Sequence, residues 1–136
     1  MKKKEFQSGI KLKYEHLLSF DRTKVDELIQ IGKDINEDVL DQMLDLHFKT
    51  SIDIVTEMSA ALQNSNLIKV AELAHKFKSN SGQLGLFKLN MMCGDLENLI
   101  KVMPISKDEI CELINLIFQE NQLTSGKLKL LQGQVA

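Results

Sequence analysis

Residues 73–82 read LAHKFKSNSG, and this stretch decides how the chain folds. Successive residues of an α-helix lie about 100° apart around its axis, so a helical wheel separates the two sides of the stretch. Val70, Leu73, Phe77 and Leu84 gather on the side opposite His75. The pattern therefore predicts an amphipathic helix that buries the Phe77 side in a core and turns His75 towards solvent.

The same periodicity predicts helices on both sides of this stretch. A first helix is expected over 22–32, capped by Asp21 or Thr23 and ended by Gly32. Asn36 is expected to cap a second helix over 37–63. Asn66 precedes the helix with His75, which we expect over 67–82, or to 84 at most, because Gly85 breaks it.

Two more helices follow. One is expected over 86–102, and the other begins after a capping box, in which Ser106 and Glu109 have the S-x-x-E spacing. No alternation is long enough to predict a strand. The sequence therefore predicts an all-α fold, an antiparallel up-and-down four-helix bundle whose additional N-terminal helix caps one end. His47 falls on the apolar side of the second helix and is expected to be a structural histidine.

Length and charge limit what the protein can be. The 136 residues fit one domain. We expect a basic tail or arm over 1–19, since residues 1–20 carry five lysines and two acids, and a bundle over 20–136. The net charge of −2 argues against a nucleic-acid partner. No apolar run suits a membrane span or a secretory signal, and two cysteines are too few for a disulfide framework. A cytoplasmic monomer is expected.

The wheel gives His75 accessible surroundings. Ala71, Lys78, Ser79 and Gly82 flank it within about 60°, and Ile68 lies on the same side. Histidine has an ordinary pKa of about 6.5, so an exposed imidazole keeps a lone pair near neutral pH and can attack phosphorus. The ammonium of Lys78, one turn away, could offset charge on a phosphoryl group. Residues expected to contact a partner are Ile68, Ala71, Glu72, Ser79 and Gly82.

Spacing adds a family resemblance to these features. The chain reads Ala74-His75-x-Phe77-Lys78-Ser79-x-Ser81-x-x-Leu84-Gly85, then Leu89-x-x-x-Cys93-x-x-Leu96-Glu97. This stretch resembles the histidine phosphotransfer (HPt) domain, whose consensus is A-H-x-L-K-G-S-S-x-x-L-G, then L-x-x-x-C-x-x-L-E. The spacing of the two agrees without a gap. One departure is Ser79, where the family usually has glycine. We expect slower or more selective transfer from this change.

The resemblance implies a function and its residues. His75 would accept and donate phosphoryl groups, Lys78 would stabilise their charge, and Glu97 would orient the imidazole. The chain would be a phosphocarrier without a kinase active site, shuttling phosphoryl groups between receiver-domain aspartates in a multistep two-component phosphorelay. Its partners would be the receiver domains of a hybrid sensor histidine kinase and of a response regulator. It would bind no cofactor itself, because the receiver supplies Mg²⁺.

Three alternatives compete with this interpretation. Glu72-x-x-His75 resembles a di-iron motif, but His16 and His47 lack a glutamate three residues before them, so we expect no metal site. The chain could be a helical adaptor that docks a response regulator and is never phosphorylated. It could also be the phosphoacceptor domain of a chemotaxis-type kinase, a related bundle whose glycine-rich segment after the lysine is not matched here.

Overall fold

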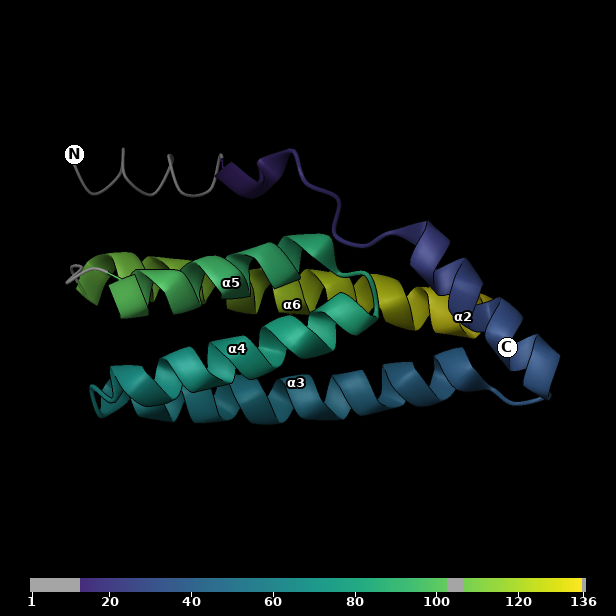
Figure 1. Ribbon diagram of the computed structural model, residues 1–136, viewed down its shortest axis with the longest axis horizontal. Helices are drawn as coiled ribbons and strands as arrows, with labels where there is room; N and C mark the ends of the chain where they lie inside the picture. The colour runs from purple at the N-terminus through teal and green to yellow at the C-terminus, as the bar shows by residue number, and fades with distance from the viewer. Residues whose placement is uncertain (1–12, 103–106, 136) are drawn as a thin grey trace.

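The computed structural model describes residues 13–102 and 107–135, and this part of the chain contains helices and no strand. The helices are α2 (Arg22–Ile35), α3 (Val39–Gln63), α4 (Leu67–Gln83), α5 (Phe87–Val102) and α6 (Lys107–Val135). Helices α3 to α6 form an antiparallel bundle in which each packs against the next and α6 returns to α3, while α2 crosses one end (Figure 1). The predicted four-helix bundle with a capping helix is confirmed.

The core is mostly aliphatic and follows the predicted spacing. In α4 the side opposite His75 is buried, with Phe77 and Val70 at 0% exposure. The last helix buries one side as well, and each helix thus contributes one apolar stripe to a shared interior. The largest fully buried side chains are Phe77, Leu44, Ile54, Met58, Leu86, Leu89, Leu96, Ile110, Leu113, Ile114, Ile117 and Leu128.

The junction between α2 and α3 corrects two expectations. Helix α2 does begin at the Asp21 cap, whose Oδ1 accepts from the backbone N–H of Thr23 at 2.9 Å. It does not end at Gly32 but continues to Ile35, and Asn36 terminates it in the left-handed conformation at φ 57°. Gly32 is needed because a Cβ there would lie 2.5 Å from the Glu37 carbonyl oxygen. Asn36 therefore closes α2 and does not cap α3, which starts at Val39.

The turn between α4 and α5 sets the pairing of these two helices. Helix α4 starts at the Asn66 cap, whose Oδ1 accepts from the Lys69 N–H at 3.2 Å. It ends at Gln83, and Gly85 follows at φ +71°, a conformation that side chains rarely adopt. Asp21 donates its backbone N–H to the Gly85 carbonyl at 3.0 Å, so the start of α2 is tied to this turn.

Residues 13–20, which include part of the predicted basic arm, lie along α5 (Figure 1). Tyr14 is only 2% exposed, and its hydroxyl donates to Oδ2 of Asp95 at 2.6 Å. Lys13 forms an ion pair with the same carboxylate at 2.9 Å. This end of the arm is therefore packed on the bundle. The capping-box residue Ser106 lies outside the described residues.

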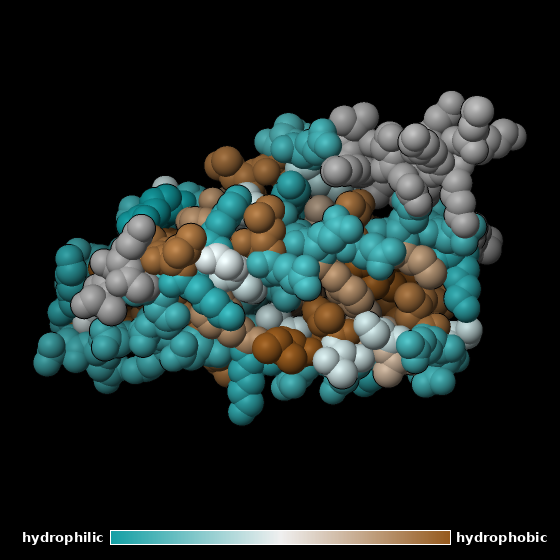
Figure 2. Space-filling model, turned by 180° about the vertical axis from the view of Figure 1, so that it is seen from behind, coloured by the Kyte–Doolittle hydropathy of each residue, from teal (hydrophilic) through white to brown (hydrophobic). Residues whose placement is uncertain are grey.

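Much of the remaining surface is polar. Figure 2 shows one face, where hydrophobic groups are interrupted by hydrophilic side chains. None of the helices in the described ranges has the length and apolar character needed to cross a bilayer. The same ranges hold no group of three or more histidine, cysteine or acidic side chains placed to bind a metal ion. Cys93 and Cys111 are both free thiols.

Candidate functional site

His75 lies on the outer side of α4, with 63% of its side chain exposed. The turns around it are held by hydrogen bonds from buried or partly buried side chains. The hydroxyl of Ser81 donates to the Phe77 carbonyl at 2.7 Å, and Asn90 of α5 donates from Nδ2 to the Lys78 carbonyl at 2.8 Å. The imidazole is thus presented to solvent by a helix that is fixed to its neighbour.

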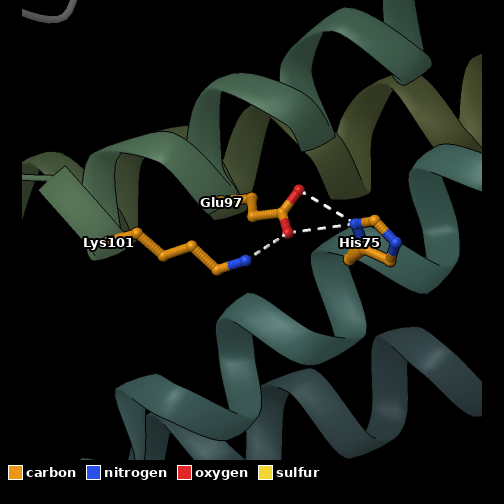
Figure 3. Close-up of polar contacts among 3 residues, drawn as sticks. All are labelled: His75, Glu97 and Lys101. Atoms are coloured by element: carbon orange, nitrogen blue, oxygen red, sulfur yellow. Dashed lines mark hydrogen bonds and ion pairs between the residues drawn. The ribbon is translucent and has the colours of Figure 1, made fainter.

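Glu97 of α5 holds one nitrogen of the ring. Nδ1 of His75 lies 3.2 Å from Oε1 and 3.0 Å from Oε2 of the carboxylate (Figure 3). An ionised carboxylate only accepts hydrogen bonds, so Nδ1 must carry the proton and donate it. In the neutral ring Nε2 then keeps the lone pair, and it lies on the far side of the ring from Glu97 (Figure 3).

The Glu97 carboxylate is largely buried, with 9% of its side chain exposed. Lys101, one turn along α5, donates from Nζ to Oε2 at 2.8 Å. Hydrogen bonding from Lys101 is the main cause that lowers the pKa of Glu97; His75 lowers it further and burial opposes both. The carboxylate therefore stays ionised at neutral pH although it is mostly shielded from water.

Lys78 is partly buried between α4 and α5. A Cβ placed on Gly94 would lie 3.5 Å from its Cδ and 3.8 Å from its Nζ, so the stem of the lysine crosses α5 at this glycine. The side chain of Lys78 therefore packs on the surface of α5. Neither Gly94 nor Lys101 was predicted from the sequence. A glycine inside a helical pattern and a Glu-x-x-x-Lys pair were the signals that could have found them.

The residues expected to contact a partner differ in how exposed their side chains are. A groove beside His75 is lined by Ile68, Ala71, Glu72, Glu97, Ile100 and Lys101. Ile68 is 74% exposed, and Glu72, Ser79 and Gly82 are exposed as expected. Ala71 also lines this groove, although it is only 4% exposed and so offers little surface to a partner.

Residues 42–124 match the model of the Hpt domain, and this range is more than half of the chain. The chain belongs to this family. This Hpt domain is also 27% identical to multistep phosphorelay regulator 1 of Schizosaccharomyces pombe, in an alignment that includes 69% of the chain. It covers 39% of that relative. No solved structure matches the chain.

Family membership fixes the general function of the bundle. Hpt domains are phosphocarrier modules, so this chain has a phosphotransfer role. The match spans the helix with His75 and the helix with Glu97. The outward imidazole of His75 therefore lies within the range that matches the family.

Proposed function

We propose that His75 accepts a phosphoryl group from the phosphoaspartate of one receiver domain and passes it to the aspartate of a second. The observation that carries the proposal is the ring geometry: Glu97 engages Nδ1, and 63% of the His75 side chain is exposed. A neutral imidazole held in this way directs its free lone pair at an incoming partner. The membership in the Hpt family and the phosphorelay relative support the same role.

The proposed transfer is an in-line displacement at phosphorus. Nε2 of His75 attacks, the Nε2–P bond forms, and the P–O bond to the receiver aspartate breaks and releases its carboxylate. The proton on Nδ1 stays hydrogen-bonded to Glu97 while the ring gains positive charge. Positioning and charge stabilisation account for most of the rate of such reactions. The receiver supplies the Mg²⁺ and the phosphoaspartate, and the hybrid kinase and the response regulator are the proposed sources of the two receivers.

The groove beside His75 is the proposed contact for the receiver. Ile68 offers an exposed apolar side chain, and Glu72 offers charge at the same edge. Ser79 and Gly82, farther along α4, are exposed and small. Ser79 in place of the usual glycine is expected to make transfer slower or more selective.

The test is a transfer assay with purified receivers. Each receiver is phosphorylated, mixed with the full chain, and the label on the chain is followed with time. We expect at least one receiver to label the chain with a phosphate that is labile in acid and stable in base, as phosphohistidine is. A chain that binds receivers but never takes up label would be the adaptor, and the phosphocarrier proposal would then be wrong.

Gly94→Leu is expected to slow transfer about tenfold, which corresponds to about 1.4 kcal/mol of transition-state stabilisation. The larger side chain needs the space that the stem of Lys78 fills, so it displaces the ammonium. Gly126→Leu is the matched control, because no atom of the described part of the chain lies within 4 Å of a Cβ at this glycine in α6. It gains the same helix propensity and should transfer at the normal rate.

The comparison with Lys78→Ala decides whether Gly94 acts through the lysine. If it does, Lys78→Ala alone slows transfer by a similar factor, and adding Gly94→Leu slows it no further. Full additivity of the two substitutions would mean that Gly94 affects transfer by another route.

A further inference from the structure

The carboxylate of Glu97 is shared between two donors. Its Oε2 lies 3.0 Å from Nδ1 of His75 and 2.8 Å from Nζ of Lys101, while Oε1 faces the ring alone at 3.2 Å (Figure 3). Both donors are largely exposed, with 63% and 62% of their side chains accessible, whereas the acceptor is 9% exposed. The lysine therefore competes with the imidazole for one buried charge.

Few other charged side chains of the described residues line the groove beside the ring. The charged groups that line the groove with His75 are Glu72 of α4 and Glu97 and Lys101 of α5. Lys78 lies one turn along α4, over Gly94. Helices α3 and α6, which pack against α4 and α5, contribute no residue to this lining within the described part of the chain. Glu97, which Lys101 also engages, is therefore the charged group in contact with Nδ1.

This sharing of Glu97 has a chemical consequence once Nε2 carries a phosphoryl group. A proton on Nδ1 makes the ring a better leaving group, because the electrons of the Nε2–P bond then return to a neutral imidazole. A carboxylate at Nδ1 favours that proton. A cation that is hydrogen-bonded to the same carboxylate weakens this stabilisation of the Nδ1 proton. Since the pKa of Glu97 is lowered mainly by its hydrogen bond to Lys101, the lysine is well coupled to the carboxylate.

We propose that Lys101 is a positioning residue that acts through Glu97 to lengthen the lifetime of phosphohistidine at His75. The inference rests on the proposed phosphocarrier function. The reaction that Lys101 slows is hydrolysis of the phosphohistidine. Water attacks phosphorus, the Nε2–P bond breaks, and its electron pair returns to Nε2. Orthophosphate leaves, the ring keeps its Nδ1 proton, and the proton of the water goes to solvent.

The test uses phosphoramidate as the donor, so that no receiver is needed. After the donor is removed, the half-life of the phosphorylated full chain is measured near pH 8. We expect Lys101→Met to shorten it about threefold, which equals a shift of about half a pH unit in the protonation of Nδ1. Lys101→Arg, which keeps the charge, should restore a half-life close to the original.

A second readout separates this effect from a structural one. The ring signals of His75 are followed by NMR against pH in the unphosphorylated chain, and Lys101→Met should move their midpoint to higher pH. Glu97→Gln should lengthen the half-life, and Lys101→Met should have no effect in that background. Lys69→Met, on the exposed surface of α4 outside the groove, changes the net charge equally and should alter neither readout.

Two results would overturn the inference. One is an unchanged half-life and an unchanged NMR midpoint in Lys101→Met. The other is an equal change in Lys69→Met, which would mean that only the net charge matters. Failure of every receiver to label the chain would count against the proposed function instead, because the phosphoramidate experiment does not depend on receivers.

Discussion

Exchange of His75 for glutamine is expected to abolish phosphoryl labelling of the chain and to leave the bundle folded. The glutamine amide has no nitrogen lone pair free to attack phosphorus, but it is polar and can still donate to Glu97. With 63% of the native side chain exposed, the free energy of unfolding should change by less than about 0.5 kcal/mol. Labelling by a phosphorylated receiver, circular dichroism and urea unfolding measure the three expectations.

The other histidines provide the controls for this experiment. The chain has three, and His47 is buried at 4% exposure, so only His16 could replace His75 as an accessible acceptor. His16→Gln should therefore be labelled to the full extent. Label that persists in His75→Gln but disappears when His16 is also replaced would place the acceptor in the arm and contradict the assignment of His75.

Periodicity predicted the direction of His75 because one helix side has to face the core. The wheel also placed Ala71 on the outward side, but it treats the helix as if it stood alone, and Ala71 is only 4% exposed in the bundle. Ala71 lines the groove that residues of α4 and α5 form beside His75. The end of α2 was misplaced for a related reason. Gly32 is required by the close approach of the Glu37 carbonyl and not by the end of the helix.

The parts of the site that the sequence did not predict depend on contacts between helices. The resemblance implied that Glu97 orients the ring, but the role of Gly94 as the surface under Lys78 follows only from the pairing of α4 with α5. The same limit applies away from the site. Glu120 of α6 is 4% exposed, and Nζ of the partly buried Lys88 of α5 lies 3.7 Å from its Oε1, an ion pair that no spacing along the sequence reveals.

His47 is a buried base. Neither of its ring nitrogens has a hydrogen-bond partner among the residues that the structure describes, and the ring lies near Phe48 and Phe77, with centroids 6.1 and 6.4 Å away. Burial lowers the pKa of His47 from 6.5 to about 4. The folded bundle therefore excludes a proton that the unfolded chain binds, and this difference links its stability to pH.

The bundle is expected to lose about 3 kcal/mol of unfolding free energy through His47 as the pH falls from 7 to 4. Because the pKa is lowered on folding, the stability is fully present above pH 6.5, declines between 6.5 and 4, and changes no further below 4. His47→Leu should remove this decline, since leucine has similar volume and no proton to bind. Urea unfolding at several pH values measures the free energy of unfolding of both proteins. The difference between the original chain and His47→Leu at each pH is the contribution of His47, because carboxylates such as Glu97 titrate in both. Parallel stability curves would show that His47 is protonated equally in the folded and unfolded chains.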